Sequence, residues 1–342
     1  MNMFFLVYII FLTISFIFVN RYLLKTNYLI SETGDSHQKF ASKIKTPLTG
    51  GIYIFLTILY FLDNSNIVLI LFSFAILTLG IFSDLKFIVS AKKRLIFQLS
   101  IVMFFVIIND VQITDTRIYL LDQILSNVYI NYAFVCFCIL IVVNGSNFFD
   151  GLNTLNTGYF FLICLIVTFL QVNYFISSEE IIFKNFILVL AIVFIFNFLN
   201  KIFLGDSGSY LLGFLFSVLL IILYENNGNI SPFFIILLLW YPSFETLFSM
   251  IRKNILNRSP MKPDSNHLHQ LIYFFIKKKY SLRVLSANLL TANIINIYNL
   301  LVFLIASKFL MNTQIQVILI LLNLIVYTVI YFKLFVYRYK KI

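Results

Sequence analysis

The sequence predicts an all-α, polytopic integral membrane protein with about eleven transmembrane helices. Three observations carry this prediction: 61% of the 342 residues are hydrophobic, only 11% are charged, and the apolar residues fall in long runs between short polar breaks. A soluble domain carries roughly a quarter charged residues, and surface-to-volume scaling limits how much apolar surface one aqueous core can bury. The composition therefore excludes a water-soluble globule, a disordered chain and a nucleic-acid-binding module.

Eleven apolar runs are long enough to cross a bilayer or to pack inside a membrane protein. They are expected over residues 3–20, 48–63, 66–83, 95–109, 131–149, 156–176, 181–199, 208–224, 230–250, 286–307 and 314–335. The runs are too long and too uniformly apolar for the alternating strands of a membrane β-barrel. No small-residue cleavage site follows the first run, so a retained span is expected rather than a signal peptide.

The basic residues predict the orientation of the chain. With the amino terminus outside, 22 of the 25 lysines and arginines fall on the inner side, and only Arg117, Lys184 and Lys308 lie outside. Basic loops stay cytoplasmic, so the net charge of +11 indicates topology and contact with membrane lipid, not a nucleic-acid partner. The carboxyl terminus is then cytoplasmic. All three cysteines lie in apolar runs, which gives no support to a disulfide framework.

Half of the acidic residues fall on the predicted inner side, several of them at span ends beside glycine, asparagine or serine. These residues are Glu32, Asp35, Asp84, Asp150, Asp206, Glu245 and Asp264. Carboxylates at membrane depth are costly and usually functional, so their grouping on one side predicts a cation site. We expect one transmembrane domain, residues 1–342, whose inner loops 21–47, 84–94, 150–155, 200–207 and 251–285 form this site.

The segment from Asn144 to Asn153 interrupts the fifth apolar run with amides, glycines and one carboxylate. Asn144, Asn147 and Asp150 are three residues apart and would share one face of a helix. Two interpretations stay open. Either these groups grip a polar headgroup, or the segment is an ordinary helix end with capping chemistry.

Two further carboxylates stand at the inner ends of spans. Asp206 lies within Gly205–Ser209 at the start of an apolar helix, where it could cap the helix or bind Mg²⁺, which takes few carboxylates together with phosphate. Phe203 precedes it and could stack on a base. Asp84 ends the third run ahead of a basic stretch, and it could equally be a loop acid.

The longest inner loop, from Arg252 to Gln270, holds two of the three histidines in the chain, His267 and His269. With Asp264 this pair could suggest zinc, but a zinc site needs four such ligands, or three in an enzyme. Contact with phosphate is therefore the favoured interpretation of the loop.

Taken in order, these segments resemble the polyprenyl-phosphate N-acetylhexosamine-1-phosphate transferases (glycosyltransferase family 4). This family includes phospho-N-acetylmuramoyl-pentapeptide transferase and the enzymes that initiate O-antigen and teichoic-acid linkage units. The resemblance rests on Lys43…Pro47…Gly50-Gly51, Gly80…Asp84…Lys93…Gln98, Asn144…Asn147…Asp150-Gly151, Phe203…Gly205-Asp206…Gly208-Ser209…Gly213 and Asp264…His267-Leu268-His269. Five stretches in sequence are specific, and the His-Leu-His form looks more like the glycan-initiating branch than the peptidoglycan branch.

The resemblance implies an enzyme that transfers N-acetylhexosamine-1-phosphate from a UDP-sugar to polyprenyl (undecaprenyl) phosphate, with release of UMP and a requirement for Mg²⁺. The donor comes from the cytosol and the acceptor from the leaflet, so the site would lie at the inner face of a bacterial cytoplasmic membrane. Such phosphoryl transfer needs positioning and charge neutralisation more than covalent chemistry. A homodimer is left open by the sequence.

The resemblance also implies roles for single residues. Asp84, Asp150 and Asp206 become the candidate catalytic carboxylates, and Asp206 and Asn147 become the candidate metal ligands. The remaining implied roles place Asp84 near the lipid phosphate and Asp150 with Asn147 near the nucleotide and metal. Asn144 joins the substrate-binding residues, with Lys43, His267 and His269 on the diphosphate and Phe203 against uracil.

Three positions depart from the family pattern. Ser83 stands where the family usually has the first of two aspartates, Asn153 where it has a second aspartate after the Asp-Gly pair, and Gln270 where it has a histidine. A catalytically impaired member that only binds lipid phosphate is therefore one alternative. A polytopic transporter or flippase for an anionic lipid or nucleotide sugar is another, and it predicts polar residues spread through the depth of the bilayer.

Overall fold

The computed structural model describes residues 3–31, 45–62, 66–174, 180–257, 259 and 264–340. Within these ranges the chain forms fourteen α-helices and a single isolated bridge between Ile30 and Pro47. The helices are α1 (Met3–Thr26), α2 (Gly50–Phe61), α3 (Ile67–Asp84), α4 (Ala91–Ile108), α5 (Tyr119–Leu125), α6 (Val128–Phe149), α7 (Leu155–Tyr174), α8 (Glu180–Phe198), α9 (Gly205–Glu225), α10 (Pro232–Leu238), α11 (Trp240–Ile255), α12 (Leu268–Tyr280), α13 (Val284–Lys308) and α14 (Thr313–Tyr339). The prediction of an all-helical protein is confirmed.

Six of these helices are each long and apolar enough to cross a membrane, namely α1, α3, α6, α9, α13 and α14. Helices α10 and α11 pass the same test together as one broken span, and α2, α7 and α8 contain shorter apolar segments. The chain is therefore a multi-pass membrane protein. The count of eleven spans and the outside position of the amino terminus stay predictions.

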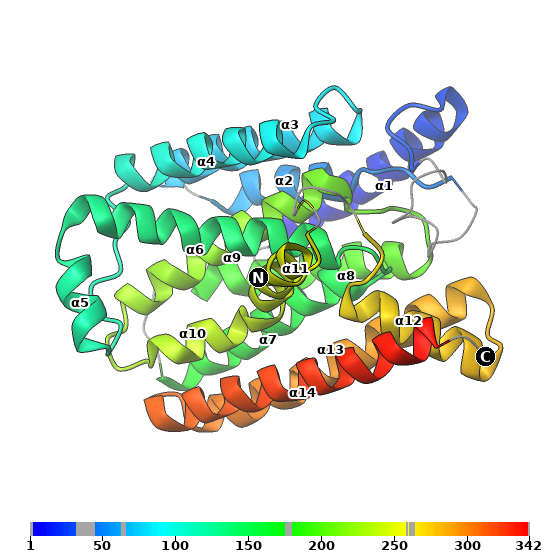
Figure 1. The fold of residues 1–342 in the computed structure, drawn as a ribbon. Coiled ribbons are helices and arrows are strands. Elements are labelled where there is room, and N and C mark those ends of the chain that lie inside the picture. The colour runs from blue at the N-terminus through cyan, green and yellow to red at the C-terminus, as the bar shows by residue number, and fades with distance from the viewer. Residues whose placement is uncertain are drawn as a thin grey trace.

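Helix α9 is the central helix of the bundle (Figure 1). Its apolar window is 94% buried, against 22% for the peripheral helices α1 and α14. Two glycines let neighbouring helices approach its first turn. A Cβ added to Gly80 of α3 would lie 2.3 Å from the Ser207 Cα, and one added to Gly51 of α2 would lie 2.5 Å from the Gly208 nitrogen. The start of α2 and the last turns of α3 therefore pack directly against the start of α9.

The single helix expected over 230–250 is instead two helices, α10 and α11, which meet at 74°. Pro242 explains the break, because proline has no N–H to donate to the carbonyl four residues earlier. That carbonyl, on Leu238, instead accepts a 2.8 Å hydrogen bond from the hydroxyl of the buried Tyr159. Tyr159 therefore stabilises the bend from outside the helix.

Two helices lie where the sequence interpretation expected loops, α5 and α12. Helix α12 buries Leu268, Leu271, Tyr273 and Ile276, and its last turn carries the three lysines 277–279. Basic residues in the last turn favour a helix because they complement its macrodipole. The predicted inner loop 251–285 is therefore largely helical.

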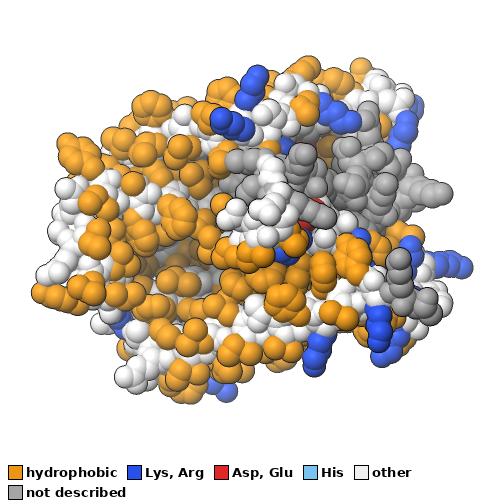
Figure 2. Space-filling view, viewed as in Figure 1, with side chains coloured by type: hydrophobic (Ala, Val, Ile, Leu, Met, Phe, Trp, Pro, Cys, Tyr) orange, Lys and Arg blue, Asp and Glu red, His pale blue; other side chains and the backbone are white. Residues whose placement is uncertain are grey.

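The bundle has two chemically different ends. At one end, here called the site end, α3 and α6 finish and α9 begins; at the opposite end α9 finishes and α10 begins. Helix α12 and the carboxyl terminus lie toward the site end, and α5 lies at the opposite end (Figure 1). Hydrophobic side chains dominate the face shown in Figure 2, and most of its lysines and arginines lie toward the site end.

Candidate active site

Asp84, the last residue of α3, caps the amino terminus of α9. One carboxylate oxygen accepts the Asp206 backbone N–H at 2.8 Å, and the other accepts the Ser207 N–H at 3.1 Å. Gly205 makes room for this contact, since its φ is +69° and a Cβ there would lie 2.6 Å from the Asp84 carboxylate. Of the two roles left open for Asp206, cap or ligand, the cap belongs to Asp84.

Asp206 is instead paired with the basic end of α4. Arg94 donates to the Asp206 Oδ2 at 2.7 Å and to the Ser83 Oγ at 2.8 Å, and the Ser83 hydroxyl donates to the same Oδ2 at 2.5 Å. The Arg94 and Asp206 side chains are 26% and 24% exposed, so the ion pair is open to solvent. An incoming anion or cation can therefore compete for either partner.

Tyr210 and Asn147 extend this centre toward α6. Tyr210 lies one turn after Asp206, with its hydroxyl 3.5 Å from the Asp206 Oδ2, and Asn147 donates to that hydroxyl at 3.2 Å. Asn144, one turn earlier on α6, donates to Gln98 of α4 at 3.0 Å. The predicted amide face of α6 thus points toward α4 and the first turns of α9.

Asp150 follows α6 directly and is the third carboxyl of the group. Burial raises its pKa well above the ordinary aspartate value, and the negative charges of Asp206 and Asp84 raise it further. Hydrogen bonding with Ser209 opposes this rise. Three carboxyls within electrostatic reach of one another form an arrangement that a bound cation would stabilise.

The histidine loop contacts the Asp150-Gly151 turn. A Cβ added to Gly151 would lie 2.9 Å from the His269 Nε2, so only a glycine fits beside this fully buried ring. The His267 ring stacks on that of His269, with 5.7 Å between centroids, and also lies 5.4 Å from the ring of Phe148. The end of α6 and the start of α12 therefore form one surface.

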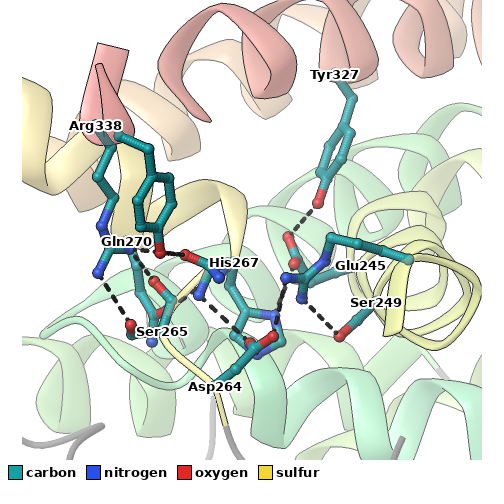
Figure 3. Close-up of polar contacts among 11 residues, drawn as sticks. Glu245, Ser249, Asp264, Ser265, His267, Gln270, Tyr327 and Arg338 are labelled. Atoms are coloured by element: carbon teal, nitrogen blue, oxygen red, sulfur yellow. Dashed lines mark hydrogen bonds and ion pairs between the residues drawn. The ribbon is translucent and has the colours of Figure 1, made fainter. Parts of the chain in front are cut away.

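His267 lies between two carboxylates (Figure 3). Its Nδ1 is 2.8 Å from Glu245 of α11, and its Nε2 is 3.5 Å from Asp264, which also pairs with Arg252 at 2.9 Å. Burial raises the pKa of Asp264, but the Arg252 hydrogen bond and the His267 charge outweigh it, so the pKa lies below the ordinary value. Asp264 therefore serves as an anion that fixes this loop.

Two predicted site residues are less well defined. Lys43 lies outside the described residues; its neighbour Lys45 donates to Asn27 at 2.6 Å. The Phe203 backbone accepts from the Gly50 N–H and donates to the Pro47 carbonyl, at 3.0 and 2.9 Å, which joins the entry of α2 to the entry of α9. The Phe203 side chain is half-buried, and Phe203 precedes Asp206 by three residues in the sequence.

Each departure from the family pattern has a definite partner in this chain. Ser83 bridges Arg94 and Asp206, as described above. The Asn153 side chain donates to the Asn197 carbonyl and to the Asn200 side chain, at 3.1 and 3.0 Å. Gln270 accepts the His267 backbone N–H at 3.2 Å and so caps α12. All three side chains therefore take part in hydrogen bonds that stabilise the fold.

The centre offers few oxygen donors to a cation such as Mg²⁺. Among the described residues, no three His, Cys, Asp or Glu side chains form a group that could hold a metal by themselves. The hydrogen bonds described for Asp206 all go to Oδ2, and Asn147 uses its amide nitrogen on Tyr210. One carboxylate oxygen and one amide oxygen thus remain as donors. This set fits Mg²⁺, which completes its shell with water and phosphate oxygens.

Sequence reasoning gave no individual site role to Arg94, Tyr210 or Glu245, although Glu245 was among the inner-side acids expected to form a cation site. It singled out Lys93, which the structure leaves exposed. Helical spacing would have favoured Arg94, since Arg94 and Gln98 are four residues apart and share a face of α4. The same spacing relates Asp206 to Tyr210. Nothing in the sequence pairs Glu245 with His267, because their contact depends on the fold of the loop between them.

Comparison with known proteins decides the family. The profile described as Glycosyl transferase family 4 matches residues 66–224. A phospho-N-acetylmuramoyl-pentapeptide-transferase of Staphylococcus saprophyticus is 31% identical over 264 residues, which cover 68% of this chain and 79% of the relative. The chain belongs to glycosyl transferase family 4. It is therefore a membrane-embedded transferase.

Two further relatives extend the family-4 match. A probable undecaprenyl-phosphate N-acetylglucosaminyl 1-phosphate transferase of Bacillus subtilis is 28% identical and covers 73% of this chain and 72% of the relative. An undecaprenyl-phosphate alpha-N-acetylglucosaminyl 1-phosphate transferase of Thermotoga maritima is 26% identical and covers 80% and 82%. The family-4 profile contains Asp84, Asn147, Asp150 and Asp206 and ends before the histidine loop.

Proposed function

We propose that the chain transfers N-acetylhexosamine-1-phosphate from a UDP-sugar to polyprenyl phosphate, giving a polyprenyl-diphosphate sugar and UMP. The family and the names of its relatives support this class of reaction. In the reaction, an oxygen of the lipid phosphate attacks the β-phosphorus of the donor. The bond from that phosphorus to the bridging oxygen breaks, and UMP leaves with the electron pair.

One observation carries the proposal: the Asp206–Arg94 pair lies within the same polar surface as Asp150 and the histidine loop. Five segments far apart in sequence contribute to this surface, and all of them lie at one end of the bundle. A transporter would need polar side chains along the whole depth of a pathway. The crowding of ionisable groups at one end favours chemistry at a membrane surface instead.

Mg²⁺ is the cofactor that this proposal requires. Asp206 and Asn147 would hold it, and it would neutralise the charge of the diphosphate and polarise its oxygens. Arg94, which lies beside Asp206, would pair with a phosphate oxygen, a contact that guanidinium geometry suits. Asp84 holds the first turn of α9 in place.

The histidine loop and Phe203 complete the proposed donor site. His269 lies beside the Asp150-Gly151 turn and the His267 ring stacks on it. We propose that the diphosphate replaces Asp264 at the His267 Nε2, which is 3.5 Å away, and that Lys43 adds a charge there. Phe203 offers an aromatic surface for uracil. The acceptor approaches from the leaflet, so the proposal places the protein in the bacterial inner membrane.

Membranes containing the protein test this proposal directly. With Mg²⁺, undecaprenyl phosphate and radiolabelled UDP-N-acetylhexosamines, we expect a lipid-soluble product and an equal amount of UMP. Removal of Mg²⁺ by a chelator should abolish both, and added Mg²⁺ should restore them. If no UDP-sugar gives a product while an active relative does so in parallel, the proposal is wrong.

The Arg94–Asp206 pair also favours a second candidate, an impaired member that binds substrates without turnover. In that case the pair would persist when the substrate is bound. Binding of UDP-N-acetylglucosamine with no release of UMP, at any Mg²⁺ concentration, would support this candidate over the first.

A further inference from the structure

Glu245 is a buried carboxylate whose two oxygens are both engaged. It is 1% exposed on α11. Its Oε1 lies 2.8 Å from the His267 Nδ1, and its Oε2 accepts a 2.8 Å hydrogen bond from the Tyr327 hydroxyl (Figure 3). A buried charge is tolerated only with such partners. The orientation of the His267 ring is therefore tied to a tyrosine of the last span.

Tyr327 has no other described hydrogen bond to its hydroxyl, and its ring is 1% exposed. Rings from α11 and α14 surround it: the Phe244 and Phe248 centroids lie 4.9 and 5.2 Å from its own. This packing fixes the hydroxyl in one direction, toward Glu245. A short chain of contacts thus runs from α14 through Glu245 to His267.

Helix α14 holds the same loop at a second point, near its carboxyl end. Arg338 donates to the Ser265 carbonyl at 2.5 Å and to the Ser265 hydroxyl at 3.0 Å, and the Tyr339 hydroxyl donates to the Asn266 side chain at 2.7 Å. The Arg338 guanidinium also lies 4.1 Å from the centre of the Phe274 ring on α12. These contacts fix the residues immediately before His267.

From this geometry we propose that α14 is a positioning element of the active site, which sets the His267 ring through Tyr327 and Glu245 and anchors its loop through Arg338 and Tyr339. The inference rests on the proposed function, because His267 acts there on the donor diphosphate. None of the four residues that carry it lies in the segment matched by the family profile. Tyr327 and Glu245 are positioning residues in this proposal, because both are 1% exposed and act through the His267 ring.

The physical reason is that histidine can donate to a phosphate only from a ring held in the right plane. A misplacement of about 1 Å at a reacting centre can cost on the order of a hundredfold in rate. The Tyr327 hydroxyl also keeps the Glu245 carboxylate from turning away from His267. Loss of this hydroxyl should therefore affect turnover more than the binding of the lipid acceptor.

Tyr327→Phe is the primary test, and Tyr331→Phe is its matched control. Tyr331 lies one turn further along α14, is equally buried, and its hydroxyl has no hydrogen-bond partner among the described residues. We expect Tyr327→Phe to lower kcat for the UDP-sugar about tenfold, with the KM for undecaprenyl phosphate within about twofold. Tyr331→Phe should leave both unchanged. Equal effects of the two variants would overturn the inference.

A double-mutant comparison of Tyr327 with Glu245 distinguishes a positioning role from a general effect on stability. Glu245→Gln alone should lower kcat about as much as Tyr327→Phe, and the double variant should be little worse than Glu245→Gln, because Tyr327 acts through Glu245. Multiplied effects in the double variant would mean that Tyr327 acts by another route, and the inference would then be wrong.

Hydrogen exchange on the intact protein in nanodiscs gives a readout that does not need turnover. Arg338→Gln should speed exchange of the Gln270 and Leu271 amides, which donate to the His267 carbonyl, by about tenfold, with no change in residues 110–118. Unchanged exchange would contradict the anchoring of the loop by α14. Absence of transferase activity in the wild type together with the expected exchange result would instead overturn only the proposed function.

Discussion

Two arginines, Arg94 at the site end and Arg117 at the opposite end, show how differently the two ends of this bundle are built. Arg117 donates to the backbone carbonyls of Met311 and Ile230, at 3.0 and 2.8 Å, and to the Thr313 hydroxyl at 2.8 Å. Arg94 donates to the side chains of Asp206 and Ser83 and also contacts the Tyr210 hydroxyl. Backbone carbonyls cannot leave without unfolding a loop, whereas a carboxylate can exchange its partner.

The comparison teaches that residue type alone does not distinguish function from structure in this chain. At the opposite end Glu225 accepts from the Thr114 backbone and hydroxyl, and Asp122 accepts from Thr116. The charged side chains at that end therefore hold loops in place through hydrogen bonds. At the site end Asp84, Asp206 and Asp150 lie near one another, and the nearby cationic partner of Asp206 is only partly buried. That difference underlies the following predictions.

Asp206→Asn should have the largest effect. It removes the negative charge at the centre of the proposed metal site while keeping the shape of the side chain. We expect product formation to fall by at least about a hundredfold, with unchanged amounts of folded protein in the membrane. The check is lipid-product formation beside a melting curve in detergent. Unchanged turnover would remove the role proposed for Asp206.

Asn153→Asp, which restores the residue usual in the family, should destabilise the protein rather than activate it. The Asn153 amide donates to two oxygens, on Asn197 and Asn200, and a carboxylate cannot donate to either. Loss of these two hydrogen bonds and the approach of a carboxylate to both oxygens should cost about 2 kcal/mol of the free energy of unfolding. Unfolding in denaturant measures this loss. A gain in turnover without loss of stability would contradict the structural role of Asn153.

Arg94→Lys should lower kcat/KM about tenfold, because lysine keeps the charge but loses the planar guanidinium, whose Nη1 donates to both Ser83 and Asp206. The melting temperature should stay unchanged, because the pair is partly exposed and such pairs contribute little to stability. Initial rates at several UDP-sugar concentrations measure the effect. A variant that loses stability but not activity would place Arg94 in the same class as Arg117.

Arg117→Gln should give the reverse pattern with the smallest change in activity. Loss of its bonds to the loop carbonyls should cost about 1–3 kcal/mol of the free energy of unfolding, and kcat and KM should stay within about twofold. The same denaturant and rate measurements on one preparation test both statements. A strong loss of turnover in a protein that remains folded would mean that the two ends are functionally coupled.

Much of this architecture follows from the sequence, because apolar runs between polar breaks fix helices by composition alone. The break within 230–250 was missed although Pro242 signals it in the sequence; the Tyr159 hydroxyl that takes the freed Leu238 carbonyl was not predictable, because it comes from another helix. The face of α6 that carries Asn144 and Asn147 was predictable from their three-residue spacing. The Asp84 cap on α9 was not, because a contact between residues more than 120 positions apart leaves no local pattern.

The fate of the two donor phosphorus atoms tests the central claim most directly. With UDP-N-acetylglucosamine labelled separately at the α- and β-phosphorus, wild-type membranes and undecaprenyl phosphate should move the β label into the lipid phase. The α label should stay in water as UMP. If both labels remain in water, or both enter the lipid fraction, no sugar-1-phosphate has been transferred and the account is wrong.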